Sequence, residues 1–168
     1  MNYFVTWNVD ARHGRGERFK VRQTPEMIAD DIAHDLTYPT FLTGGPRFAL
    51  GVQPLPEGVR FPDELADDDP EQMRYMQAAG SNRALTIEAR VPDPDGGGGY
   101  IHYVLAREPV ADLDRWVSLS WDNGSAELYT IQLHPEEVFT GEQAVPVFRD
   151  YIINARLPDP QLLRAIDV

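Results

Sequence analysis

The chain has 168 residues and carries 27 Asp and Glu against 15 Lys and Arg, a formal net charge of -12. An acidic surface repels nucleic acid and anionic membranes, so neither is an expected ligand, and a basic protein surface is the expected partner. Cysteine is absent, which removes disulfides, thiol nucleophiles and thiolate metal sites. The length predicts one domain over residues 1–168, and the lack of a leader peptide or a long apolar run predicts a cytoplasmic protein.

The N-terminal part predicts a hairpin followed by a helix. Residues 3–9 and 19–23 are rich in β-branched and aromatic residues, and a glycine-containing turn at 12–16 joins them. A helix starts at Thr24-Pro25-Glu26, because Thr caps a helix and Pro suits its first position, and it ends before Pro39. Its apolar face consists of Met27, Ile28, Ile32 and Leu36.

Residues 37–83 are interrupted by prolines and predict one strand at 47–52 and one short helix at 71–79. A loop between them holds six carboxylates in nine residues, with no Lys or Arg. These are Asp63, Glu64, Asp67, Asp68, Asp69 and Glu71. A long loop of this kind is functional or disordered, so the cluster is either a docking element for a basic partner or a solvated acidic loop.

From residue 84 onward four strands are expected, at 84–91, 100–105, 115–121 and 127–133. Short connections join them, including the Asn-Gly turn that is typical of hairpins, and this favours an antiparallel meander. A last helix is expected from Pro146 to about Ala155, with Phe148, Tyr151 and Ile152 on one face. The predicted class is α+β, an antiparallel sheet of about five to seven strands with a helix near each end packed on it.

No catalytic or metal-binding pattern stands out, so the chain is expected to be no enzyme and to need no metal or cofactor. The four histidines are scattered, and His102 is expected to be a satisfied strand residue rather than a ligand. Asp67, Asp68 and Asp69 lack the spacing of a calcium loop. A carboxylate pair for glycoside hydrolysis could be drawn from Glu88, Asp122 and Glu127, which keeps a small hydrolase as an alternative.

Trp116 and Trp121 are five positions apart and therefore fall on opposite faces of one strand. One of them is expected on the face away from the main core. An exposed Trp beside acidic loops would make an interface anchor, unless a helix covers that second face.

An ordered pattern of strands, turns and a helix extends over about residues 84–160. It consists of Leu85-Thr86-Ile87, Gly99-Tyr100-Ile101-His102-Tyr103, Trp116-Val117-Ser118 with the Asn-Gly hairpin to Tyr129, and Val145-Pro146 followed by Phe148-Arg149-Asp150-Tyr151. In this order it resembles the first-numbered family of bacterial immunity proteins, and the helix after Thr24-Pro25 fits the family's opening. The tail departs from the family pattern, with Asn154 in place of a frequent Gly and no final Trp.

The resemblance implies a non-enzymatic immunity protein that neutralises a cognate toxin, typically one of the deaminase superfamily. A toxin that acts on nucleic acid has a basic groove, which an acidic inhibitor can fill quickly. The expected toxin-binding residues are Asp63, Glu64, Asp67, Asp68, Asp69, Glu71, Trp116 and Trp121. A small hydrolase and a general protein-interaction module remain as the other functions.

Overall fold

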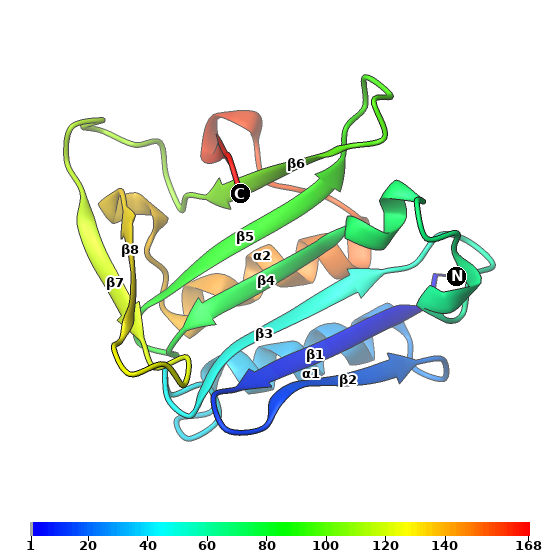
Figure 1. The fold of residues 1–168 in the computed structure, drawn as a ribbon, viewed down its shortest axis with the longest axis horizontal. Helices are drawn as coiled ribbons and strands as arrows, with labels where there is room; N and C mark the ends of the chain where they lie inside the picture. Colours follow the sequence, from blue (N-terminus) through cyan, green and yellow to red (C-terminus); the bar gives the residue numbers. More distant parts are fainter. Residues whose placement is uncertain (1) are drawn as a thin grey trace.

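The computed structural model describes residues 2–168 and contains a seven-stranded antiparallel sheet with the strand order β2-β1-β3-β4-β5-β6-β9 (Figure 1). Its strands are β1 (Phe4–Asp10), β2 (Gly14–Lys20), β3 (Arg47–Pro54), β4 (Tyr75–Gly80), β5 (Leu85–Pro92), β6 (Tyr100–Leu105) and β9 (Leu163–Ile166). Two further strands, β7 (Val117–Trp121) and β8 (Tyr129–Leu133), pair only with each other and form a separate ribbon. The α+β class with an antiparallel sheet is confirmed.

Two helices, α1 (Pro25–Thr37) and α2 (Gly141–Asn154), cover one face of the sheet (Figure 1). The main core lies between them and the sheet, and it includes Ile28 and Leu36 of α1, Phe148 and Ile152 of α2, and Ile87 of β5. Thr24 caps α1 as predicted, since its side chain accepts a hydrogen bond from the Met27 amide. Neither helix of the described residues has the length and apolar character that a membrane crossing requires.

The last helix begins at Gly141, five residues before the predicted start at Pro146. Thr140 and Gln143 form a capping box, in which each side chain bonds the other's backbone amide, and this places the start of α2 upstream. Gly141 is buried at the crossing with α1, where a methyl group would collide with the Leu36 carbonyl. Pro146 therefore lies inside the helix, and the face with Phe148, Tyr151 and Ile152 is buried as predicted.

The predicted helix at 71–79 is wrong. A short 3₁₀ turn, Pro70–Met73, precedes β4, which occupies the middle of the sheet between β3 and β5. The last residues of β4 are buried on both faces, because Ala78 packs in the main core and Ala79 packs against the ribbon, so this end of the strand lacks a clean alternation of polar and apolar residues. Met76 and Ala78 face the helices, and Gln77 lies on the opposite face.

The predicted meander is interrupted after β6. The β7–β8 ribbon leaves the sheet, and Leu119, Trp121 and Leu133 pack with Ala79 and Val104 in a second, smaller core. The edge place beside β6 is taken by β9, a strand that the sequence analysis missed. Its Arg164 makes a two-pronged ion pair of 2.7 and 2.8 Å with the buried Glu137, which fixes the C-terminal strand to the β8–α2 connection.

Candidate functional site

The face of the sheet opposite the two helices, called the open face, is covered by no helix (Figure 1). Strand alternation brings one set of side chains to it from all seven strands of the sheet. Trp7 pairs across from Glu17 and Gly51, and the register of the other strands continues this face. The set includes Arg15, Glu17, Phe19, Trp7, Gln53, Tyr75, Gln77, Glu88, Arg90, Tyr100, His102 and Arg164.

Four of these residues form a hydrogen-bonded group, called the polar network: Gln77, Glu88, Arg90 and His102. The Glu88 Oε2 atom accepts from His102 Nε2 at 2.9 Å and from Gln77 Nε2 at 3.1 Å. His102 is only 3% exposed, and its Nδ1 atom accepts from Arg90 Nε at 3.1 Å. His102 is thus a satisfied core residue, as predicted.

The contact with Arg90 defines the protonation state of His102. A guanidinium can only donate, so Nδ1 must carry a lone pair, and the ring proton must sit on Nε2 and point at Glu88. His102 is therefore a neutral imidazole in this arrangement. Neither of its nitrogens is left to take a proton from a substrate.

Burial raises the pKa of the Glu88 carboxyl, but the hydrogen bonds from His102 and Gln77 and the nearby positive charge outweigh burial and hold that pKa below its ordinary value. Burial raises the pKa of the neighbouring Tyr75 hydroxyl. At neutral pH Glu88 is therefore a carboxylate, and Tyr75 is a neutral phenol.

A row of stacked cationic and aromatic side chains crosses the open face beside the polar network. Arg15 lies 4.0 Å above the Trp7 ring, and Trp7 meets Tyr75 edge to face at 5.8 Å. Arg90 then lies between Tyr75 and Tyr100, at 5.2 and 4.2 Å from the ring centroids. Gly51 makes the row possible, because a methyl group there would overlap the Trp7 indole.

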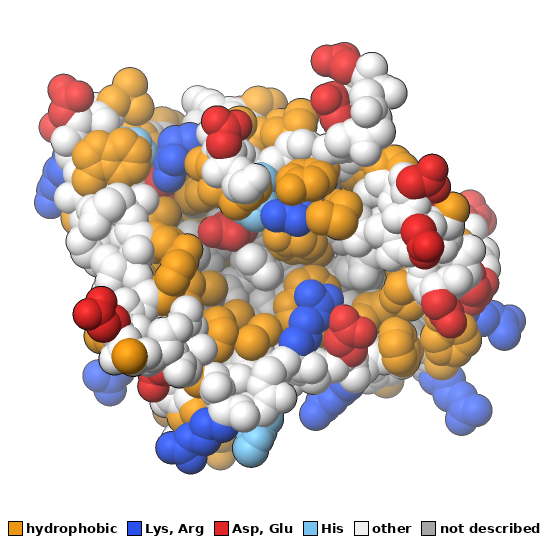
Figure 2. Space-filling model, viewed as in Figure 1, with side chains coloured by type: hydrophobic (Ala, Val, Ile, Leu, Met, Phe, Trp, Pro, Cys, Tyr) orange, Lys and Arg blue, Asp and Glu red, His pale blue; other side chains and the backbone are white. Residues whose placement is uncertain are grey.

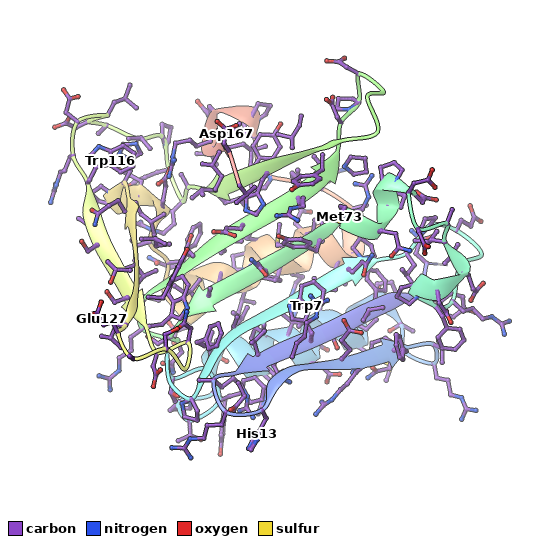
Figure 3. All side chains as sticks on the ribbon, viewed as in Figure 1. Trp7, His13, Met73, Trp116, Glu127 and Asp167 are labelled. Carbon is purple, nitrogen blue, oxygen red and sulfur yellow. The ribbon has the colours of Figure 1, made fainter. Side chains whose placement is uncertain are left out.

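The middle of the open face is hollowed between the ribbon and the opposite end of the sheet (Figure 2). Trp7 lies centrally on this face, and Trp116 lies on the ribbon at its margin (Figure 3). The small residues Ala49 and Ala79 lower the floor next to the ribbon, where they pack with Trp121. The hollow therefore combines a small-residue floor, an aromatic wall and one carboxylate.

The segment from Asp63 to Glu71, called the acidic segment, lies at the other end of the open face (Figure 2). Three of its six carboxylates support local structure: Glu64 accepts the Phe61 amide at 2.9 Å, Asp69 accepts the Glu71 amide at 2.9 Å, and Glu71 pairs with Arg74 at 2.6 Å. Among the described residues, Asp63, Asp67 and Asp68 are exposed and bond to none. Only these three have no structural use for their charge.

Of the two predicted tryptophans, one is exposed and the other is buried. Trp116 is 47% exposed and stacks on His134 at 3.9 Å, whereas Trp121 is 8% exposed and packs against Phe48 and Tyr129. Trp121 attaches the ribbon to the sheet and offers no contact surface. The structure does not bring the predicted residues into one patch, because the acidic segment and Trp116 lie at different ends of the open face.

An exposed aromatic pair beside the acidic segment was missed. Phe19 of β2 and Phe61 are 48% and 40% exposed, and their rings meet edge to face at 5.6 Å. They line an open groove together with Glu17, Pro62 and Asp63. The sequence held no signal for this pair, since 42 positions separate the two rings. Part of the polar network, in contrast, could have been found from the sequence, because the polar residues Glu88 and Arg90 stand at alternate positions of a predicted strand.

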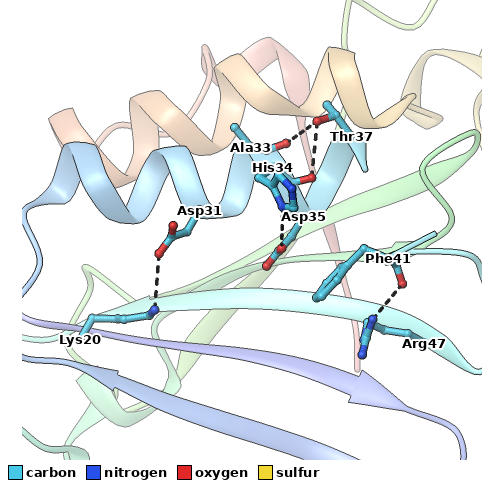
Figure 4. Close-up of polar contacts among 8 residues, drawn as sticks. All are labelled: Lys20, Asp31, Ala33, His34, Asp35, Thr37, Phe41 and Arg47. Carbon is cyan, nitrogen blue, oxygen red and sulfur yellow. Dashed lines mark hydrogen bonds and ion pairs between the residues drawn. The ribbon is translucent and has the colours of Figure 1, made fainter. Parts of the chain in front are cut away.

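A polar cavity of about 180 Å³ lies on the helix side, between α1 and the β1–β2 hairpin. Lys20 pairs with Asp31 at 3.6 Å, and His34 Nδ1 lies 3.5 Å from Asp35 Oδ1 (Figure 4). Burial raises the pKa of the Asp35 carboxyl, although its contacts with His34 oppose the rise. Its charged side chains pair mainly with one another, Lys20 with Asp31 and His34 with Asp35, so it is a weaker candidate than the open face.

The carboxylates considered for hydrolysis do not form a pair. Glu88 belongs to the polar network, whereas Asp122 and Glu127 are exposed in the β7–β8 turn, where Asp122 accepts the Gly124 amide. No group of three or more His, Asp or Glu residues suited to a metal ion occurs in residues 2–168.

Comparison of the chain with protein-family models, with curated proteins and with solved structures finds no match. The resemblance to immunity proteins therefore stays a prediction.

Proposed function

We propose that the chain is a non-catalytic inhibitor of the immunity-protein kind, which binds a toxin domain with a basic surface and occludes its nucleic-acid groove. The observation that carries the proposal is the exposed pair of Phe19 and Phe61, which lines a groove together with Asp63. Two further exposed carboxylates of the acidic segment, Asp67 and Asp68, follow in the chain. Exposed aromatic rings anchor protein interfaces, and charges around them select the partner.

The charge of the chain supports a basic partner. The net charge is -12, and the acidic segment carries three carboxylates that stabilise nothing within the described fold. A field of one sign speeds association with an oppositely charged surface, and salt screens it over about 8 Å at physiological ionic strength. A basic groove built for phosphates is such a surface.

The geometry of the open face favours binding over hydrolysis. Glu88 holds two hydrogen bonds on one oxygen, and both nitrogens of His102 are occupied, so this pair cannot work as a base and its relay. Asp122 and Glu127 lie elsewhere, on the ribbon turn. A protein-interaction module without a toxin partner is the remaining alternative.

The experiment uses the reading frame next to the gene for this chain. Its product should stop growth when expressed alone, and co-expression of this chain should restore growth and give a stoichiometric complex. If the neighbour is harmless, or if growth does not return, the proposal fails. A complex without any toxicity would support the interaction module instead.

The role of the acidic segment is tested by changing Asp63, Asp67 and Asp68 to Asn and measuring association with that toxin domain. Association should slow at low salt, the gap should close at high salt, and unfolding should be unchanged. The control changes Glu26 and Glu142 to Gln, two exposed carboxylates on the helix side. An equal slowing in the control would mean that net charge alone acts.

A further inference from the structure

The carboxylate of Glu88 forms no direct ion pair with a Lys or Arg among the described residues, although the charge of Arg90 lies nearby. Its Oε2 atom takes both hydrogen bonds of the polar network, and Oε1 takes none. The side chain is 21% exposed, and its one ion-pair contact is His102, which the Arg90 bond keeps neutral. A carboxylate can accept about four hydrogen bonds, so Oε1 keeps acceptor capacity that a donor group of a partner can fill.

Arg90 is close but does not neutralise Glu88 directly. Its Nε atom donates to His102, and its guanidinium plane is held between Tyr75 and Tyr100. Arg90 therefore acts on Glu88 through His102, by fixing the tautomer that points the Nε2 proton at the carboxylate. The result is a rigid carboxylate whose free oxygen remains available on the open face.

The surroundings of that oxygen suit the end of a long basic side chain. Tyr75 lies diagonally across from Glu88 and supplies aromatic surface beside it, Ala79 leaves space on the ribbon side, and the hollow opens to solvent (Figure 2). Aromatic walls bind the alkyl stem and attract the cation, while a carboxylate binds the ammonium or guanidinium group.

We propose that the hollow on the open face is a socket for one lysine or arginine side chain of the protein partner, with Glu88 Oε1 as its acceptor. This inference rests on the proposed function, because the overall negative charge and the acidic segment are what bring a basic surface to this face. The two features then act on different rate constants: the acidic segment raises the rate of association, and Glu88 lowers the rate of dissociation.

The first experiment needs no partner. N-acetyl-arginine amide and N-acetyl-lysine amide are titrated into the whole protein, and the Gln77 amide and Trp7 indole signals are followed by NMR. Saturable shifts at tens of millimolar are expected for the native protein and should be absent in Glu88→Gln, which keeps the shape and an acceptor for His102. N-acetyl-norleucine amide is the uncharged control. No shift with either cation, or equal shifts in Glu88→Gln, would overturn the socket.

The second experiment uses the toxin domain. Glu88→Gln should raise the dissociation rate by at least about thirtyfold and leave the association rate nearly unchanged. The matched control is Glu17→Gln, an open-face carboxylate that is already paired with Arg15 at 2.9 Å, and it should change dissociation little. If native protein binds no toxin, the proposed function fails. If it binds and Glu88→Gln dissociates as slowly as the native protein, only the socket fails.

Discussion

The two faces of the sheet are built from the same strands but differ in the side chains that they carry. The helix face is mainly apolar, with Leu50 and Ile87 of the sheet fully buried beneath α1 and α2. The open face instead carries Glu88, His102 and Arg90 at positions that a core would fill with apolar residues. Because alternate residues of a strand point to opposite sides, one sequence can specify a stabilising face and a binding face independently. Stability should therefore depend on the first and recognition on the second.

The largest expected difference between the faces comes from truncating one aromatic residue on each. Phe148→Ala should lower the free energy of unfolding by about 3–5 kcal/mol, because it opens a cavity in a packed core. Tyr100→Ala, at a residue that is 38% exposed, should cost less than about 1 kcal/mol. Urea unfolding measures both. Equal losses would mean that the open face is as much a core as the helix face.

A smaller effect is expected where the open face is itself tightly packed. Gly51→Ala should cost about 1–3 kcal/mol, because the added methyl group must displace the Trp7 indole from its place between Arg15 and Tyr75. Gly16→Ala is the control, since nothing lies within 4 Å of the corresponding methyl position on β2. Thermal unfolding and Trp fluorescence report the two changes. If Gly51→Ala behaves like Gly16→Ala, the row of stacked side chains is loose.

The smallest effect is a pH dependence. The folded-state pKa of Glu88 lies below its ordinary value of 4.5, so Glu88 stabilises the fold fully above that pH and loses its contribution as the pH falls through the lower folded value. Glu88→Gln should cost about 1 kcal/mol at neutral pH, and the gap to the native protein should narrow on acidification. Unfolding curves at several pH values test this. A gap that widens in acid would contradict the hydrogen bonds assigned to the Glu88 carboxylate.

Local chemistry made several elements predictable. Thr24 and Pro25 set the start of α1 independently of the tertiary structure, because a capping side chain bonds a backbone amide within the first turn of the helix. The β7–β8 hairpin follows from the Asn-Gly turn between two strand-forming runs. The N-terminal hairpin was expected too, but its second strand is Gly14–Lys20 rather than residues 19–23, because the glycine-containing segment pairs with β1. That one of Trp116 and Trp121 is exposed agrees with their spacing, but the spacing did not indicate which one. The same local logic misplaced α2, since Pro146 was weighted above the capping box of Thr140 and Gln143.

The candidate site could not be predicted in the same way, because its parts are distant in the chain. Trp7, Tyr75 and Tyr100 meet only after β1, β4 and β6 take their places in one sheet, and β4 itself was mistaken for a helix. The neutral state of His102 depends on its hydrogen bond with Arg90, and this bond exists only because the pairing of β5 with β6 places the two residues opposite each other.

The sequence by itself determined the acidity of the chain, the strands and caps, and the antiparallel class, since each depends on composition or on neighbours within a few positions. Only the tertiary structure decided that both helices cover one face, that the ribbon leaves the sheet, and that Glu88 keeps a free oxygen on the open face. Those features depend on which strands become neighbours, and non-local pairing is selected by the packing of the whole chain rather than by any local preference.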